Sequence, residues 1–175
     1  MKWWPWIVIA AVLIMQKASE RSPGSWSANF SRNEFIKPGD RDTISKASED
    51  SLKAIVTNVL QPARNKLGLP IRITSAYRSP AENAVIGGVS GSQHIFGQAV
   101  DVQPVPNTLQ NAKKLWDILA SGTYDQLIWE NAIAFSGKPS HLHVSFVVPG
   151  LNPASPKQVN RKRKYQYLNG NYSYI

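Results

Sequence analysis

The clearest hydrophobic pattern in the chain is a helical repeat between Thr43 and Leu67. Its apolar positions are Ile44, Ala47, Leu52, Ile55, Val56, Val59 and Leu60. Because apolar residues return at helical spacing, the segment predicts an amphipathic helix with one buried face. Pro62 has no backbone N–H to donate, so we expect it to kink or split the helix near its C-terminal end. Gly68 is a typical stop signal.

Four segments alternate between apolar and polar residues, as strands do when one face is buried. They are residues 69–79, 97–104, 124–130 and 141–148. In the second segment, the valines on either side of Asp101 point away from its carboxylate. In the last segment two sets of side chains alternate between opposite faces, Leu142, Val144 and Phe146 on one and His141, His143 and Ser145 on the other.

Two helical segments lie between these strands. Residues 79–88 predict a short helical turn that ends on paired glycines, and Asn107 is the expected cap of a second helix that ends at Gly122. The inward side chains of this second helix are Leu109, Ala112, Leu115, Trp116 and Leu119. Helices followed by strands, with one helix inserted, predict an α+β fold. We expect a mainly antiparallel sheet of about four strands with helices packed on one face.

The start of the chain has a different pattern, an uninterrupted apolar run from Trp3 to Met15 after one lysine. Such a run forms about 20 Å of helix, which is short for a membrane span and close to a signal-peptide core. An internal core helix is the alternative, but a run that is apolar on all sides fits it poorly. We expect residues 1–16 to be an export signal or a membrane anchor. A linker over residues 17–29 and a folded domain over 30–150 would follow.

Composition limits the chemistry of the chain. Its 175 residues include no cysteine, which excludes disulfides and thiolate metal sites, so a bound metal needs His, Asp or Glu ligands. Part of the net charge of +9 lies in residues 151–175, at Lys157, Arg161, Lys162, Arg163 and Lys164. We expect this basic tail to be solvated, or to be attracted to an anionic membrane or wall polymer. It has no groove-reading motif, which argues against nucleic acid as a partner.

Asp101, between two valines, raises the question of what offsets the cost of burying its carboxylate. The three histidines fall in two segments, with His94 seven residues before Asp101 and the pair His141 and His143 in the last predicted strand. A single buried histidine is more often a hydrogen-bonded core residue than a metal ligand. Two imidazoles and one carboxylate nevertheless form a known zinc ligand set with an open fourth position. A dication held by His94, Asp101 and His143 would offset the cost at Asp101.

The residues around these positions resemble a known family. The stretch SAYRSPAENAVIGGVSGSQHIFGQAVDVQP, with YDQLIWE and HLHVSF, is similar to the zinc D-Ala-D-Ala carboxypeptidases and their phage endolysin relatives. This family belongs to a superfamily that includes the hedgehog signalling domain. The motif S-x-H-x-x-G-x-A-x-D is matched at Ser92, His94, Gly97, Ala99 and Asp101, and the later H-x-H at His141 and His143. The resemblance covers residues 30–147.

The resemblance implies one zinc ion with His94, Asp101 and His143 as ligands. It also implies that Arg78 binds the substrate carbonyl or carboxylate and stabilises the oxyanion, which suits a guanidinium fork. A surface salt bridge is the alternative role of Arg78.

The resemblance also suggests roles for Ser92, His141 and the general base. Ser92 would hydrogen-bond the substrate or hold its loop. His141 would lie beside the metal and stabilise the tetrahedral intermediate, or else be a strand residue at the solvent edge. Many family members have an acid three residues before the last ligand histidine, but this chain has Ser140 there. We therefore assign the general base to Glu130, which could equally be a rim residue at a strand end, whereas Asp125 looks structural.

These inferences predict a zinc metallopeptidase that hydrolyses peptidoglycan stem peptides, as a D,D-carboxypeptidase or an endopeptidase. An exported single domain with a basic tail suits a phage lysis or entry factor. The alternative is a non-catalytic, zinc-stabilised binding module of the same fold, which Ser140 favours, or a virion structural component that keeps the peptidase domain.

Overall fold

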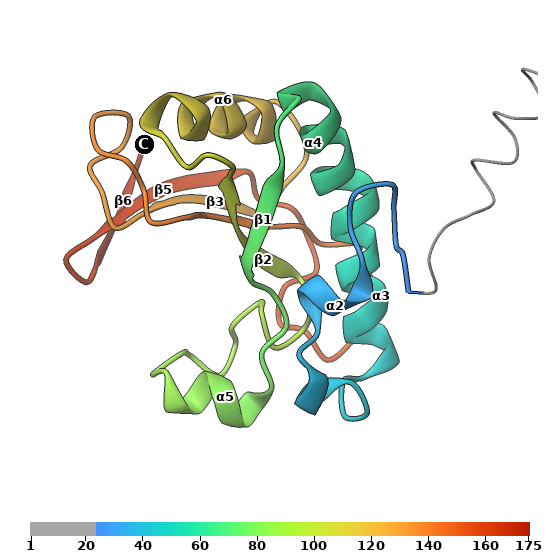
Figure 1. The fold of residues 1–175 in the computed structure, drawn as a ribbon. Coiled ribbons are helices and arrows are strands. Elements are labelled where there is room, and N and C mark those ends of the chain that lie inside the picture. Colours follow the sequence, from blue (N-terminus) through green and yellow to red (C-terminus); the bar gives the residue numbers. More distant parts are fainter. Residues whose placement is uncertain (1–23) are drawn as a thin grey trace, which may run out of the picture.

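The structure is a computed structural model that describes residues 24–175. The chain folds as an α+β protein with one six-stranded sheet, most of whose helical cover lies on one side (Figure 1). The predicted signal or anchor over residues 1–16 lies outside the described residues. Within residues 24–175, no helix has both the length and the apolar character needed to cross a bilayer.

The first four strands are the ones that the alternation predicts. They are β1 (Ile71–Ser75), β2 (Ala99–Pro104), β3 (Gln126–Glu130) and β4 (Leu142–Ser145). Their spatial order is β1-β2-β4-β3, and every neighbouring pair is antiparallel. Because successive side chains of a strand point to opposite faces, the valines of β2 and β4 enter the core while Asp101 and His143 lie on the other face.

Two more strands extend the sheet beyond β3, namely β5 (Arg163–Leu168) and β6 (Asn171–Tyr174). β5 runs parallel to β3, and β6 folds back antiparallel on β5. Asn169 and Gly170 form the two-residue turn between them with φ of 52° and 83°, as in the tight turns that suit β-hairpins. The expectation of about four strands is therefore wrong in number. The sheet has six strands and is mixed, and residues assigned to a solvated basic tail form two of them.

A buried ion pair fixes the chain before β5. Asp125 is fully buried, and the Arg161 guanidinium donates to both of its carboxylate oxygens, over 2.5 Å from Nε and 2.6 Å from Nη2. The backbone N–H of Arg161 adds a third hydrogen bond of 3.0 Å. A buried carboxylate needs such a cationic partner, so this contact explains why the basic segment is held against the domain. It also agrees with a structural role for Asp125.

The predicted long helix is present but has a wider turn inside it. It consists of α3 (Lys46–Ile55), the π-helical turn η2 (Val56–Leu60) and α4 (Gln61–Leu67). The N–H of Gln61 bonds the carbonyl of Val56, five residues back, directly before Pro62. Pro62 offers no N–H and its ring crowds the preceding turn, which explains why the regular helix is interrupted there. Gly68 ends the helix at φ 70°.

The hydrophobic core lies between one face of the sheet and this long helix together with α6 (Leu109–Ala120), as Figure 1 shows. Thr108 rather than Asn107 caps α6, because its hydroxyl accepts a 3.1 Å hydrogen bond from the N–H of Asn111. Trp116 of α6 packs edge-on against Trp129 of β3, with 5.8 Å between the ring centroids. The helices of the core therefore leave the opposite face of the sheet free for Asp101 and His143.

Ordered structure also begins earlier than the predicted start of the domain at Phe30. Trp26 stacks on Phe35 with 5.2 Å between centroids, and the hydroxyl of Ser27 donates to Gln61 over 2.7 Å. These contacts place residues 24–29, part of the predicted linker, against the folded body. Three short helices complete the described elements: α2 (Arg32–Phe35), η1 (Pro38–Asp40) and α5 (Pro80–Val85). α5 lies on the side of the sheet away from α6 (Figure 1).

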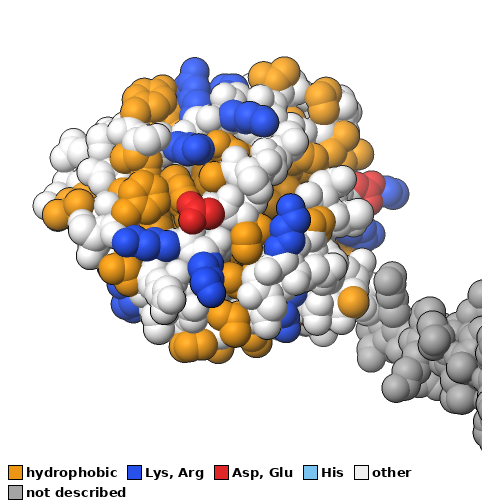
Figure 2. All heavy atoms as spheres, turned by 90° about the horizontal axis from the view of Figure 1, so that it is seen from above, with side chains coloured by type: hydrophobic (Ala, Val, Ile, Leu, Met, Phe, Trp, Pro, Cys, Tyr) orange, Lys and Arg blue, Asp and Glu red, His pale blue; other side chains and the backbone are white. Residues whose placement is uncertain are grey.

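The positive charge is spread over the surface. Figure 2 shows Lys and Arg side chains distributed among hydrophobic and uncharged groups on the face that it presents. Of the basic residues in the predicted tail, Arg161 is committed to Asp125. The positive charge is therefore not confined to one free basic tail.

Candidate metal centre and substrate cleft

Cross-strand pairing brings two of the three predicted ligands together. Asp101 of β2 lies directly opposite His143 of β4, and both side chains are buried on the sheet face away from the core. Directly paired residues on one face of an antiparallel sheet have neighbouring side chains. The Nδ1 atom of His143 lies 2.9 Å from Oδ1 of Asp101.

A glycine turn delivers the third ligand. His94 lies in the loop that precedes β2, and Gly97 follows with φ 65°, in the left-handed region that favours glycine. A Cβ atom at Gly97 would lie 2.1 Å from the Ser48 carbonyl oxygen in α3, so the close contact with the helix also requires glycine. Gly97 thus lets the chain turn back after His94.

A backbone carbonyl fixes the orientation of the His94 ring. Its Nδ1 lies 2.7 Å from the carbonyl oxygen of Ala76, and because a carbonyl can only accept, Nδ1 carries the proton. The lone pair of Nε2 is then free and faces Asp101 and His143. A hydrogen bond from the second ring nitrogen to a carbonyl is the usual support of a metal-ligating histidine.

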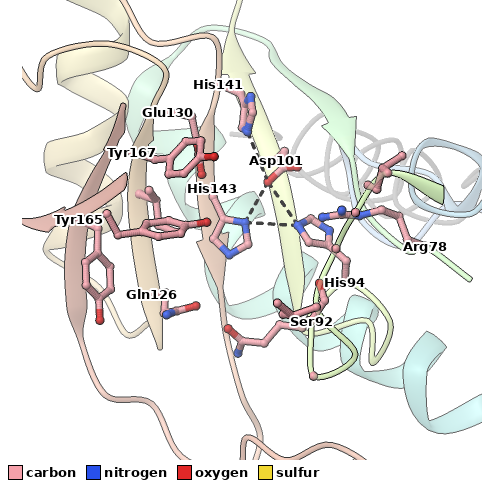
Figure 3. A pocket seen from close by; sticks show the side chains of 18 of the residues that line it. Arg78, Ser92, His94, Asp101, Gln126, Glu130, His141, His143, Tyr165 and Tyr167 are labelled. Atoms are coloured by element: carbon pink, nitrogen blue, oxygen red, sulfur yellow. Dashed lines mark hydrogen bonds and ion pairs between the residues drawn. The ribbon is translucent and has the colours of Figure 1, made fainter. Parts of the chain in front are cut away.

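The three ligand atoms form a triangle of the size that a metal requires (Figure 3). Nε2 of His94 lies 3.3 Å from Nδ1 of His143 and 3.4 Å from Oδ1 of Asp101. An ion held tetrahedrally at about 2.0–2.1 Å separates its ligand atoms by about 3.3–3.5 Å. Two edges of the triangle match this separation, and the third, between Nδ1 of His143 and Oδ1 of Asp101, is shorter at 2.9 Å. The donor types suit a divalent metal at His94, Asp101 and His143.

The electrostatics favour the protonation states that bind a metal. Burial acts to raise the pKa of Asp101, but the neighbouring imidazoles of His94 and His143 hold that pKa well below its usual range. Burial lowers the pKa of His94 despite the opposing charge of Asp101. The site thus keeps the carboxylate ionised and the His94 imidazole neutral, as ligands must be.

Glu130 and His141 stand beside this cluster. Glu130 ends β3, and its N–H donates to the His141 carbonyl over 3.2 Å, so the two residues face each other across the sheet. Nε2 of His141 lies 3.8 Å from Oδ1 of Asp101. Burial raises the pKa of Glu130 to about 7, an effect that nearby His143 opposes. Burial lowers the pKa of His141.

Ser140, at the position where the family resemblance expects an acid, supports His141. Its hydroxyl lies 3.0 Å from Nδ1 of His141 and accepts a 2.9 Å hydrogen bond from the Asn131 amide. The hydroxyl therefore steadies the outer edge of the imidazole, while Nε2 faces the cluster. A buried acid is present in this region at Glu130, on the neighbouring strand.

Arg78 and Ser92 line the cleft on the other side of the cluster (Figure 3). The backbone N–H of Arg78 donates to the His94 carbonyl over 3.4 Å, which ties the arginine to the ligand loop. Among the described residues, its buried Nε has no hydrogen-bond partner. The predicted alternative, a surface salt bridge, is not seen for Arg78 in the described part of the chain.

The cluster opens into a cleft of about 1040 Å³. Sequence reasoning did not identify one of its two walls. One wall is the loop after α5 and the other is the β5–β6 hairpin, through Tyr165, Tyr167 and Tyr172. The sequence contains a signal for this wall, because Asn169–Gly170 between two Tyr-x-Tyr stretches is typical of a β-hairpin. The neighbouring basic run led instead to the expectation of a solvated tail.

The model of the Peptidase M15 family matches residues 28–144, which is more than half of the chain. A search among curated proteins found no match to the sequence. The matched region includes β1 to β3, β4 except its last residue, and every residue of the metal cluster, and it ends before β5.

Proposed function

Because this chain belongs to the peptidase M15 family, we propose that it is a zinc peptidase that hydrolyses a peptide bond in the stem peptides of peptidoglycan. The observation that carries this proposal is the triangle of His94, Asp101 and His143 at the bottom of an open cleft. Two imidazoles and a carboxylate are ligands that zinc accepts, and three protein ligands leave one position open. When bound, zinc supplies Lewis acidity that polarises a carbonyl and acidifies water.

Glu130 is the residue that we propose as the proton carrier. Its carboxylate lies on the same sheet face as the ligands and lines the cleft. A pKa of about 7 suits a group that accepts a proton from the attacking water and returns it to the leaving amine. The charge of a bound dication would lower this pKa and favour the ionised form that acts as a base.

Three hydrogen-bond donors would hold the substrate. Arg78 presents a guanidinium at the ligand loop, where it can bind a carboxylate of the stem peptide or the oxyanion of the transition state. His141 directs Nε2 toward the cluster, from which it can stabilise the same oxyanion. Ser92, on the loop that carries His94, can hydrogen-bond the peptide backbone. Attack, proton transfer and charge stabilisation thus fall to different side chains of one cleft.

Cleavage of purified walls tests the proposal. Zinc-loaded protein should release new amino groups from walls of at least one chemotype, and a chelator should abolish the release. Glu130→Gln should lower kcat by about a hundredfold or more while zinc binding is kept. Asp117→Asn is the matched control, because it removes an exposed carboxylate on α6, across the sheet from the cleft.

Absence of cleavage by the zinc-loaded wild type on walls of every chemotype would overturn the peptidase proposal. Zinc binding without cleavage would favour the binding-module alternative. Mass spectrometry of the released fragments distinguishes a D,D-carboxypeptidase cut from an endopeptidase cut.

We also propose that the protein works outside the cytoplasm as a phage lysis or entry factor. The apolar run from Trp3 to Met15 supports export or anchoring, and the substrate class lies outside the inner membrane. Membrane fractionation of the full chain tests the localisation. Its presence in purified particles, as against lysates alone, distinguishes a virion component from a free lysis enzyme.

A further inference from the structure

The β5–β6 hairpin gathers four tyrosines on one face of the sheet. In β5, Tyr165 lies opposite Ile128 and Tyr167 opposite Glu130 of β3, so both side chains share the face of the metal cluster. In β6, Tyr174 pairs with Tyr165 and Tyr172 with Tyr167, which places all four rings on that face. We call Tyr165, Tyr167, Tyr172 and Tyr174 the tyrosine face.

The four rings form one continuous and exposed surface. Ring centroids lie 4.6 Å apart for Tyr165 and Tyr174, 4.6 Å for Tyr167 and Tyr172, and 6.0 Å for Tyr165 and Tyr172. The side chains of β6 remain exposed, Tyr172 at 61% and Tyr174 at 70%. Single exposed aromatic residues are ordinary, but a contiguous group of them marks a binding surface.

This surface continues the cleft of the metal centre. Tyr165, Tyr167 and Tyr172 line the same cavity as His94 and Asp101, and Figure 3 shows Tyr165 and Tyr167 beside His143 and Glu130. The hairpin lies beyond residue 144, where the family match ends. The tyrosine face therefore lies outside the region matched by the family and lines the cleft of the metal cluster.

We propose that the tyrosine face binds a sugar ring of the glycan strand to which the stem peptide is attached, an inference that rests on the proposed function. A pyranose has an apolar C–H face that packs on an aromatic ring, and hydroxyl groups that can bond to phenols. The phenol of tyrosine both donates and accepts hydrogen bonds.

The covalent link between the stem peptide and its sugar also favours a sugar ring over a lipid or a second copy of the chain as the occupant of the tyrosine face. A stem peptide that enters the cleft brings its sugar with it, and the tyrosine face is continuous with that cleft.

The first test compares two substrates that differ only in the sugar. The kcat/KM of the zinc-loaded full chain is measured on a stem peptide that carries its disaccharide and on the same peptide without it. The ratio of the two values should fall about tenfold in Tyr172→Ala/Tyr174→Ala, because two stacking rings are lost. Ser173→Ala is the matched control, since Ser173 lies on β6 between these residues and points to the other face. It should leave the ratio unchanged.

The second test does not require catalysis. Peptide-free glycan strands are titrated into wild type, the double Ala variant and Tyr172→Phe/Tyr174→Phe, and the heat of binding is recorded. Wild type and the Phe variant should bind, because both keep the rings, and the double Ala variant should bind at least tenfold more weakly. Circular dichroism of each variant checks that the hairpin is folded.

Equal binding by wild type and the double Ala variant, or an unchanged substrate ratio, would overturn the sugar proposal while cleavage itself continued. A change of oligomeric state in the double Ala variant would overturn it in favour of contact between copies through β6. Loss of all cleavage by wild type would instead contradict the proposed peptidase function, and the glycan titration would still report on the tyrosine face.

Discussion

Glu130 is a carboxylate held where water has little access. It is 7% exposed, at the end of β3, on the sheet face that also carries Asp101 and His143. Burial favours its neutral form, and the negative charge of Asp101 adds to this effect. Without a metal, the ionised form of Glu130 is therefore a cost to the folded state. This cost gives a measurable signature that is separate from catalysis.

The metal-free protein should lose stability between pH 4.5 and pH 7 because of Glu130. Its pKa rises from an ordinary 4.5 to about 7 on folding, so in this window the folded state binds more protons than the unfolded state. Stability must then fall as pH rises, by on the order of 2–3 kcal/mol for this group. Urea unfolding of chelator-treated wild type and Glu130→Gln at pH 4.5 and pH 8 measures the effect.

From pH 4.5 to pH 8, the free energy of unfolding of Glu130→Gln should rise by about 2 kcal/mol relative to that of wild type, since the amide does not ionise. Asp117→Asn, which changes an exposed carboxylate, should show no such gain. A difference between Glu130→Gln and wild type that is the same at both pH values would contradict the assigned pKa.

At the same scale, the grouping of His94, Asp101 and His143 was predictable in part because the spacing of the first two is local. His94, Gly97 and Asp101 lie within eight residues, and the strand pattern alone places Asp101 and His143 on the polar faces of their strands. Glu130 lies beside His141 because β3 pairs antiparallel with β4. The Ala76 carbonyl that orients His94 has no sequence signal, because it depends on where a backbone passes in space.

At the scale of elements, the β5–β6 hairpin is the part that sequence reasoning missed. β1 to β4 carry strong alternation with one buried face, and they were predicted for that reason. β5 has partly exposed side chains on both faces and pairs in parallel with a strand more than thirty residues earlier, so its pattern resembles a polar tail. What holds it in place is the contact of Arg161 with Asp125, a pairing that spacing cannot indicate.

Arg161→Ala should destabilise the protein by about 3 kcal/mol, because it leaves the fully buried Asp125 without its cation. Chemical denaturation measures the loss, and limited proteolysis should show earlier cleavage within residues 161–175. Lys162→Ala is the control, since Lys162 is the exposed neighbour in the same segment. An equal loss of stability in both variants would show that the ion pair is not what fixes the hairpin.

At the scale of the whole molecule, one face of the sheet forms the hydrophobic core and the other face forms the candidate site. One face packs against the long helix and α6, and the other face holds the ligands, the acid and the tyrosines. The fold class and the one-sided helical cover were predictable from the hydrophobic pattern. The number of strands and the second wall of the cleft were not predictable from this pattern. Both depend on β5, which pairs with β3 although it lies far from β3 in the sequence.

Zinc should stabilise the whole domain through this arrangement. The three ligands come from β2, β4 and the loop before β2, so an unfolded chain offers no comparable site. At zinc concentrations about a hundredfold above Kd, the gain is about 2.7 kcal/mol, which raises Tm by roughly 5–10 °C. Differential scanning fluorimetry with and without zinc measures the shift, and His94→Ala should abolish most of it. A shift of full size in His94→Ala would place the metal elsewhere.

The parallel pairing of β3 with β5 also bears on the order in which the protein is made. Until residues 163–168 have left the ribosome, the outer edge of β3 has no partner, and its N–H and C=O groups remain open to pairing with other chains. Asp125 likewise has no cationic partner until Arg161 has been synthesised. A nascent chain that already contains every residue of the candidate metal cluster is thus still unprotected along β3, and residues 163–174, which are synthesised after that cluster, both close the sheet and complete the cleft.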